Sequence, residues 1–359
     1  MRRPDRHHAE PFRVLVVDPA HGEQALPELI ALEDLGLTPT VNLRRVNDVS
    51  LRARIEADWE TVDFDGFCEE ELARQLEDEG RGFEALKCRA GIPLTRKVLE
   101  RATAGGLRRR LVLVGHAAAG TDTFDLAAAQ HLGVSVRTTP GANAGAVAEL
   151  TVSLMLDTLR EVARRDRDLR AGSWSSGVEG LPAGSLDGAR VGLVGSGAIA
   201  RRTAELVRVF GAEVWVFGSP RFTPERAADW PGQRVDTLTE LLTGCDVVSV
   251  HVPATPATER LIGAAELRSM RPGSVLINTA RASVVREEAL DRALRDPGAG
   301  PARAAVDVFE NEGEVFSSPL ADNPYCTLSP HVAGMTRSAM RAASDRLLEE
   351  FERFLGEYL

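Results

Sequence analysis

Short apolar runs alternate with longer amphipathic stretches along most of the chain. The first run covers residues 12–18, and similar runs recur at intervals that leave room for a helix between them. Short apolar runs bounded by turn residues are typical of strands buried on both faces of a parallel sheet. The predicted strands cover residues 12–18, 40–43, 83–87, 111–114, 134–137, 191–195, 213–217, 246–250, 274–278 and 302–308. This alternation predicts an α/β fold with a doubly wound parallel sheet.

Four stretches interrupt this rhythm. Residues 1–11 are polar and predict a disordered tail, whereas residues 44–82 are acidic and irregular, and no element is predicted there. Residues 144–163 carry apolar side chains at helical spacing and predict one long helix. Residues 171–188 are rich in Gly and Ser and predict a surface loop.

Length and charge limit the possible classes of protein. A chain of 359 residues predicts two domains, and 53 acidic against 43 basic residues give a net charge of -10. Nucleic acid and anionic membranes favour a basic surface, so neither is expected as a partner. The sequence has no apolar run long enough to span a membrane and no signal peptide at its start, which predicts a cytoplasmic protein. The four cysteines form no CxxC pair, so we expect no metal site and no disulfide framework.

A glycine-rich turn follows the strand at 191–195. Gly195, Gly197 and Ala200 fit the pattern G-x-G-x-x-G/A between an apolar strand and a helix. The first glycine permits a tight turn, and the second lets the backbone approach a pyrophosphate group. The small third residue lets helix and strand pack closely, and the phosphate charge lies at the helix N-terminus. This context predicts a site for a dinucleotide coenzyme.

The end of the following strand bears on which coenzyme is bound. Domains that prefer NAD usually carry an acidic residue there to hold the ribose hydroxyls. In this chain the strand at 213–217 is followed by Ser219 and Arg221, with no acid at its end. An arginine suits a 2′-phosphate, so the sequence favours NADP over NAD, which is kept as the alternative.

Charged side chains follow three successive strands of the same predicted sheet. Arg281 follows the strand at 274–278, Asp307 and Glu312 follow residues 304–306, and His331 follows residues 326–330. In open α/β sheets, ligands bind at the carboxyl ends of the strands. An arginine to hold a carboxylate, a histidine to deliver a proton and a carboxylate beside it are the groups that reduction of a 2-keto acid requires.

Five ordered motifs resemble those of the D-isomer-specific 2-hydroxyacid dehydrogenases, the family of glyoxylate/hydroxypyruvate reductase and phosphoglycerate dehydrogenase. The similarity runs from about residue 111 to 334 and more faintly outside it. The motifs are Asn143-Ala-Gly-Ala-Val-Ala-Glu149, His251-Val-Pro-Ala-Thr-Pro-Ala-Thr258, Met270 to Arg281, Asp307-Val-Phe-Glu-Asn-Glu312 and Ser329-Pro-His-Val-Ala-Gly334.

The resemblance implies a role for each matched residue. Arg281 is expected to bind the substrate carboxylate, with His331 as general acid/base and Glu312 as its partner. Asp307 is expected to contact the nicotinamide carboxamide. The other residues implied to bind the coenzyme, together with the turn glycines, are Ala198, Ile199, Ser219, Arg221, Val252, Pro253, Thr258, Thr279 and Ala280.

The substrate residues implied by the resemblance lie in the first part of the chain. Ala118, Ala119 and Gly120 belong to a loop whose backbone N–H groups are expected to receive the carboxylate. Lys87 and Cys88 fall where a first-domain loop is expected to close over the substrate. This loop has alanines where the family usually alternates glycines, and Ala282 replaces a usual glycine after Arg281. These departures bear on which acid is bound and leave the class of reaction unchanged.

The resemblance also implies how the domains are arranged. A Rossmann-type dinucleotide-binding domain at 143–331 is expected to be inserted in a flavodoxin-like substrate domain formed by 11–142 and 332–359. The implied function is NAD(P)-dependent interconversion of a small anionic 2-keto acid and a D-2-hydroxy acid by a homodimer. Two alternatives stay open: a formate or phosphite dehydrogenase-like enzyme, although formate enzymes pair the histidine with glutamine, and a nucleotide-sensing co-repressor-like binding protein.

Overall fold

The chain forms two compact units in the computed structural model, which describes residues 10–174, 184–296, 298, 300–312 and 315–358. Unit 1 combines Met1–Asn143 with Arg337–Leu359, and unit 2 is the uninterrupted segment Ala144–Thr336. The predicted tail at 1–9 and the centre of the predicted loop at 171–188 lie outside the described residues. Unit 2 therefore begins one residue later than the predicted start at 143 and ends five residues later than the predicted end at 331.

Unit 1 is a parallel sheet of six strands in the order β3-β2-β1-β4-β5-β6. Its strands are β1 (Phe12–Val16), β2 (Leu37–Asn42), β3 (Glu60–Val62), β4 (Ala85–Cys88), β5 (Leu113–His116) and β6 (Ser135–Thr138). Without β3 the order is that of a flavodoxin-like sheet, and the short β3 adds a sixth strand at the edge. The predicted parallel α/β fold is confirmed, with one edge strand more than expected.

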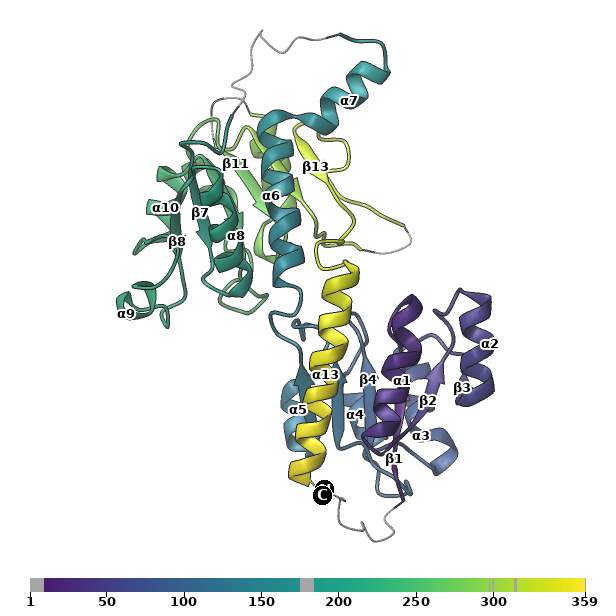
Figure 1. The fold of residues 1–359 in the computed structure, drawn as a ribbon. Coiled ribbons are helices and arrows are strands. Elements are labelled where there is room, and N and C mark those ends of the chain that lie inside the picture. Colours follow the sequence, from purple (N-terminus) through teal and green to yellow (C-terminus); the bar gives the residue numbers. More distant parts are fainter. Residues whose placement is uncertain (1–9, 175–183, 297, 299, 313–314, 359) are drawn as a thin grey trace. The chain divides into compact units, whose positions relative to one another are not determined.

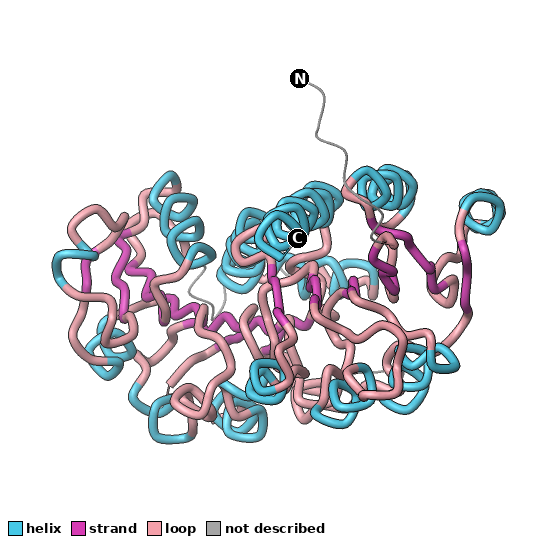
Figure 2. Tube along the Cα trace, turned by 90° about the horizontal axis from the view of Figure 1, so that it is seen from below, coloured by secondary structure: helices cyan, strands magenta, loops and turns pink. Residues whose placement is uncertain are grey.

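The helices of unit 1 cover both faces of its sheet, as Figure 2 shows for each sheet. They are η1 (Gly22–Gln24), α1 (Ala25–Asp34), α2 (Val49–Asp58), α3 (Glu69–Glu77), η2 (Asp78–Gly80), α4 (Arg96–Ala102), α5 (Leu126–His131) and α13 (Arg337–Tyr358). Alternate β1 residues supply the two cores: Leu15 packs in the cluster of α3, α4 and α5, and Val16 in that of α1 and α13. Figure 1 shows α13 beside α1, so two distant parts of the chain complete one core.

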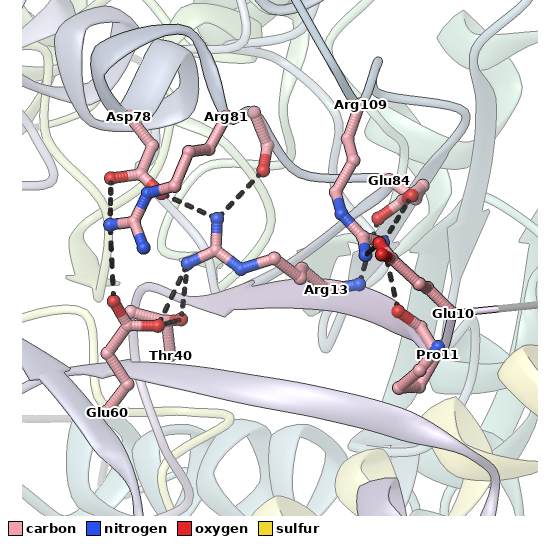
Figure 3. A network of polar contacts seen from close by, with 10 residues as sticks. Glu10, Pro11, Arg13, Thr40, Glu60, Asp78, Arg81, Glu84 and Arg109 are labelled. Carbon is pink, nitrogen blue, oxygen red and sulfur yellow. Dashed lines mark hydrogen bonds and ion pairs between the residues drawn. The ribbon is translucent and has the colours of Figure 1, made fainter.

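An arginine network closes the amino end of the sheet in unit 1 (Figure 3). The guanidinium group of Arg13 on β1 donates to Glu60 Oε2 at 2.9 Å and to Asp78 Oδ2 at 2.5 Å. The same group lies over the ring of Phe83, 4.3 Å from its centroid. The network ties β1 to β3 and to the segment before β4, and it adds polar contacts to the apolar packing of α3 within residues 44–82.

Unit 2 is a parallel sheet of seven strands in the order β13-β12-β11-β10-β7-β8-β9. The strands are β7 (Arg190–Val194), β8 (Glu213–Phe217), β9 (Gln233–Arg234), β10 (Val247–Val250), β11 (Val275–Asn278), β12 (Arg303–Val306) and β13 (Cys326–Leu328). The chain runs outward from β7 to β9 and returns to the other side of β7 at β10. This reversal places a topological switch point between the carboxyl ends of β7 and β10.

Helices also cover both faces of the sheet in unit 2. They are α6 (Ala144–Arg160), α7 (Val162–Arg170), α8 (Ala198–Val209), α9 (Pro224–Ala227), α10 (Leu238–Gly244), α11 (Ala264–Ser269), η3 (Ala282–Val284) and α12 (Glu287–Leu294). One core joins α6 and α8 to the sheet, and a second joins α10, α11 and α12 to the opposite face. Neighbouring residues such as Val247 and Val248 enter different cores, as expected for strands buried on both faces.

The prediction of one helix at 144–163 is wrong, because a break at Glu161 separates α6 from α7 (Figure 1). Glu161 has a φ of 55°, in the left-handed region that interrupts an α-helix. Its buried carboxylate accepts a hydrogen bond from Arg303 Nε on β12 at 2.9 Å and forms an ion pair with Arg303 Nη2 at 2.8 Å. This pairing fixes the break to the sheet, and the apolar periodicity of the helix gives no sign of it.

Candidate active site

Six strands of unit 2 end at one edge of the sheet, and the predicted coenzyme and catalytic residues follow them. All neighbouring pairs in this sheet are parallel, so the carboxyl ends of its strands meet at the same edge. Gly195 follows β7, Ser219 follows β8 and His251 follows β10. Arg281 comes three residues after β11, and His331 three residues after β13.

The turn after β7 has room for a ligand and leaves little room for a side chain. Gly195 has a φ of 118°, and a Cβ atom there would lie 2.4 Å from the carbonyl oxygen of His251. Its N–H donates to Phe217 O at 2.7 Å, which ties the turn to the end of β8. Only glycine fits this position, because both the backbone angle and the close approach of β10 exclude a methyl group.

Gly197 is the N-cap of α8 and is surrounded by open space. A Cβ atom at Gly197 would meet no atom within 4 Å, and the residue has no side chain with which to cap the helix. The N–H groups of the first helical turn, including those of Ala198 and Ile199, are therefore left for an external acceptor. Ala200 is fully buried against the sheet, as the pattern requires. These features fit a pyrophosphate group at the helix N-terminus.

Ser219 and Arg221 lie in an exposed turn after β8, where Phe222 N donates to Ser219 O at 2.8 Å. Within the described part of the chain, the Arg221 side chain makes no hydrogen bond or ion pair. The prediction that these residues face the ribose of a coenzyme stays a prediction.

The loop after β10 is closed by its own polar groups. Thr258 Oγ1 donates to Pro253 O at 2.6 Å and accepts a hydrogen bond from Thr255 N at 2.9 Å. His251 Nε2 lies 2.9 Å from Ser249 Oγ, and burial lowers the pKa of His251 to about 3. His251 is therefore neutral, and it belongs to the wall of the glycine turn, together with Val252.

Asn278 holds the segment that carries Arg281. Its side chain accepts from Ala280 N at 3.1 Å and donates to Arg281 O at 3.1 Å. Arg281 Nη1 donates to Ala280 O at 2.8 Å. This role of Asn278 was not predicted, although a polar residue at the end of an apolar strand is a signal of it.

Thr279 does not direct its hydroxyl toward the edge of the sheet. The Thr151 hydroxyl on α6 donates to Val147 O at 2.7 Å, so the Thr279 hydroxyl, 2.8 Å away, donates to Thr151. Both threonines are buried between β11 and α6. The side chain is thus committed to the core, and any contact with a coenzyme is left to the backbone of Thr279.

His331 and Glu312 form the closest functional pair of the site. His331 Nδ1 lies 2.7 Å from Glu312 Oε2, and both side chains are accessible, at 48% and 39% exposure. The second oxygen, Glu312 Oε1, accepts from Phe309 N at 2.9 Å. Because the Glu312 carboxylate accepts a hydrogen bond from Nδ1, it keeps a proton on that ring nitrogen. The other ring nitrogen of His331, Nε2, is left for a substrate.

The side chain of Asp307 accepts hydrogen bonds from the loop that carries His331. Its side chain is fully buried, and its oxygens accept from Ser329 Oγ, from Val332 N at 3.1 Å and from Ala333 N at 2.9 Å. His331 itself has a φ of 51°, which is strained for a residue with a side chain. The described contacts of Asp307 are therefore those of a residue that shapes the His331 loop, and the expected contact with the carboxamide stays a prediction.

In unit 1 the predicted substrate residues differ in their surroundings. No hydrogen bond among the described residues uses the N–H groups of Ala118, Ala119 or Gly120, so these amides are available to an anion. His116 Nε2 lies 2.8 Å from Gly120 O, and burial lowers the pKa of His116. A neutral His116 donates to Gly120 O and so holds the shape of this loop.

Lys87 and Cys88 are both buried among partners from unit 1, and their expected contact with substrate stays a prediction. Lys87 is 1% exposed, and its ammonium group donates to Glu28 Oε2 at 2.8 Å and to Asp18 O. Cys88 Sγ lies 3.7 Å from His116 Nδ1, and burial raises the pKa of the thiol. Cys88 therefore stays a neutral S–H donor to His116.

No described helix combines the length and apolar character that crossing a membrane requires. The same part of the chain holds no group of three or more His, Cys, Asp or Glu side chains arranged to bind a metal ion.

The strand order of unit 2, its glycine turn and the polar groups along one edge define a Rossmann-type nucleotide-binding protein. A family model described as the NAD binding domain of D-isomer specific 2-hydroxyacid dehydrogenase matches residues 152–333. The chain belongs to the D-isomer specific 2-hydroxyacid dehydrogenase family.

Individual relatives agree with this assignment. The chain is 33% identical over 310 residues to an (S)-sulfolactate dehydrogenase of Chromohalobacter salexigens, covering 86% of this chain and 96% of the relative. It is 32% identical over 301 residues to a D-3-phosphoglycerate dehydrogenase of Methanocaldococcus jannaschii, covering 81% of this chain. The chain spans only about half of that relative, 52% of its length.

Solved structures share the fold over almost the whole chain. A glyoxylate reductase from Paecilomyes thermophila superposes with a TM-score of 0.77 at 26% identity, covering 95% of this chain and 94% of that structure. The fold similarity therefore extends through unit 1, beyond the residues that the family model matches.

Proposed function

We propose that the protein is an NAD(P)-dependent oxidoreductase that interconverts a small anionic 2-keto acid and a D-2-hydroxy acid. The observation that carries this proposal is the His331–Glu312 pair, 2.7 Å apart, at the sheet edge that also presents the glycine turn. Family membership and the names of the relatives, which act on phosphoglycerate, sulfolactate and glyoxylate, support the same class of substrate.

The residues of the glycine turn fit the pyrophosphate of a dinucleotide coenzyme. Gly197 leaves open space, and the free N–H groups of Ala198 and Ile199 would hold the phosphate oxygens. When bound, the nicotinamide ring supplies or accepts the hydride at C2 of the substrate. The turn with Ser219 and Arg221 would hold the adenosine ribose, and Arg221 would pair with a 2′-phosphate if one is present.

The residues at the ends of β11, β12 and β13 would perform the proton chemistry. Arg281 binds the substrate carboxylate and polarises the neighbouring carbonyl group. In reduction, Nε2 of His331 delivers a proton to the carbonyl oxygen, and in oxidation it takes the proton back. Glu312 orients the ring through Nδ1 and stabilises the positive charge that His331 carries before the transfer.

Steady-state oxidation of NADPH and NADH tests this function with a panel that contains glyoxylate, hydroxypyruvate and bulkier 2-keto acids. We expect turnover with at least one acid, and His331→Ala should reduce kcat by about 100- to 10,000-fold, since it removes the general acid. The affinity for coenzyme should stay nearly constant in this variant. Tight coenzyme binding without turnover of any acid would favour a nucleotide-sensing protein instead.

The coenzyme preference is tested by Arg221→Ala. We propose NADP as the preferred coenzyme, because β8 ends without an acid and Arg221 is exposed beside Ser219. The variant should weaken the binding of NADPH much more than that of NADH, as measured by titration of coenzyme fluorescence. An equal loss for both coenzymes would show that Arg221 does not bind the 2′-phosphate.

We also propose a homodimer. The proposal is supported by apolar side chains exposed on and just after α7: Val162 is 60%, Leu169 55% and Trp174 84% exposed. Exposed apolar residues that gather on one element are common at protein interfaces. Sedimentation velocity should show a dimer, and Leu169→Glu should shift it toward the monomer if α7 forms the interface.

A further inference from the structure

Glu287 is a buried acid that binds two separate points of the segment between β12 and β13. It is the first residue of α12 and is 4% exposed. Its Oε1 accepts from Glu310 N at 2.5 Å, and its Oε2 accepts from Ser318 Oγ at 2.5 Å. One carboxylate thus joins two positions of the chain that no secondary structure links.

The segment that Glu287 holds is the one that carries Glu312. Phe309 lies next to Glu310, and its N–H donates to Glu312 Oε1 at 2.9 Å. The rings of Phe309 and Phe316 pack edge to face with centroids 4.9 Å apart. Two sets of contacts therefore hold the residues on either side of Glu312: the hydrogen bonds of the Glu287 carboxylate and the packing of this ring pair. Glu312 contacts His331 from the segment that they hold.

Packing and helix stability do not explain an acid at this position. The other buried positions of α12 are filled by Ala289, Leu290 and Leu294, which pack without the cost of burying a charge. A negative charge does stabilise the first turn of a helix, but the neighbouring Glu288 supplies one while remaining exposed. What distinguishes Glu287 from Glu288 is the pair of hydrogen bonds to the Glu312 segment.

We propose that Glu287 is a positioning residue that holds Glu312 against His331. It contacts neither of these two side chains and acts through the backbone of residues 309–312 and through Ser318. This inference rests on the proposed function, because the Glu312–His331 pair does its work in proton transfer. Both side chains of this pair are accessible to solvent, so surrounding residues must hold Glu312 in place to keep the 2.7 Å contact.

The test compares Glu287→Ala, Glu287→Gln and the matched control Glu288→Ala, each with and without Glu312→Ala. Glu287→Ala should lower kcat for 2-keto acid reduction by up to about 100-fold, because small misplacements of a catalytic group have effects of this size. The dissociation constant for coenzyme should change less than twofold. Glu287→Gln, which keeps one acceptor and gains a donor for Ser318, should recover part of kcat, and Glu288→Ala should match the wild type.

The double variant separates positioning from general structural support. If Glu287 acts through Glu312, Glu287→Ala should cost almost nothing once Glu312→Ala is present. The same fold-loss in both backgrounds would overturn the proposal, as would an unchanged kcat in Glu287→Ala. Should Glu287→Ala fail to fold, Ser318→Ala, which removes one of the two hydrogen bonds, carries the same comparison.

A measurement without turnover keeps this inference apart from the proposed function. Amide hydrogen exchange of residues 309–312 should become faster in Glu287→Ala and remain unchanged in Glu288→Ala. Unchanged exchange in Glu287→Ala would overturn the inference even in an active enzyme. Absence of turnover in the wild type would instead refute the proposed function, and the exchange result would still decide whether Glu287 holds the segment.

Discussion

The buried ion pair of unit 1 gives the sharpest prediction. In Lys87→Met the Glu28 carboxylate, whose side chain is 3% exposed, loses the ammonium group 2.8 Å away and keeps only weaker donors such as Ala20 N at 2.7 Å. Removal of one partner from a buried pair costs about 3–5 kcal/mol, since the remaining charge stays buried. A domain of this size loses about 2–4 °C in Tm per kcal/mol, so we expect Tm to fall by about 6–20 °C.

Thermal and urea denaturation followed by far-UV circular dichroism measure this loss. Lys97→Met is the matched control, because Lys97 is the other lysine of the chain and pairs with Glu70 at 2.8 Å on the surface. An exposed pair contributes at most about 1 kcal/mol, so this variant should stay close to the wild type. The double variant Lys87→Met/Glu28→Gln should recover part of the loss, because it removes the unpaired charge.

Two results would refute the reasoning. A loss below about 1 kcal/mol in Lys87→Met would show that the pair is not buried as described. A raised KM for the 2-keto acid in the folded variant at low temperature, with little loss of stability, would return Lys87 to a substrate role.

The same pair predicts a dependence of stability on pH. Burial alone would raise the pKa of Glu28, but the charge and hydrogen bond of Lys87 and a hydrogen bond from Ser344 lower it below the ordinary 4.5. Because the folded-state pKa is the lower one, the stabilisation is complete above pH 4.5 and is lost as the pH falls further. The free energy of unfolding should therefore fall more steeply below pH 4.5 in the wild type than in Glu28→Gln.

Two further predictions concern the loops at the strand ends. Gly195→Ala should lose about 1–3 kcal/mol of stability, because its φ of 118° and the nearby His251 O exclude a methyl group, whereas Gly197→Ala should keep its Tm and lose only affinity for coenzyme. His116→Ala should raise KM for the 2-keto acid by about 2- to 10-fold, since it removes the hydrogen bond that shapes the Gly120 loop, with coenzyme affinity unchanged. Calorimetry and steady-state kinetics check both, and an unaffected KM in His116→Ala would contradict the role given to that loop.

Most of the fold followed from the sequence, because strands buried on both faces leave continuous apolar runs that are easy to find. The strand at 213–217 has the predicted bounds, and others shift by one to three residues. Residues 44–82 gave no prediction because α2 buries only Ile55 and β3 has three residues, none of them buried, and the three buried residues of α3 stand in a stretch dominated by acids. Phe64 and the buried residues of α3 pack in the core, and Glu60 also pairs with the distant Arg13, a contact that the local sequence does not indicate.

In the candidate site, too, some residues could be placed from the sequence and others could not. Arg281, Asp307 and His331 follow strands whose ends meet, so topology alone places them at one edge. The environment of Lys87 could not be inferred, because its partner Glu28 lies 59 positions away in the chain and belongs to an ordinary amphipathic helix. The same holds for Glu287, which looks like any acid in the first turn of a helix until its contacts with Glu310 and Ser318 are known.

The division of unit 1 into two chain segments has a consequence for biosynthesis. Leu347 and Phe351 of α13 belong to the core on one face of the unit 1 sheet, and the ring of Phe351 occupies the space beside Gly115. During translation, unit 2 is synthesised as one continuous segment before α13 is made. The unit 1 sheet therefore cannot complete the core on this face until the residues after unit 2 have been synthesised, although its strands are made first.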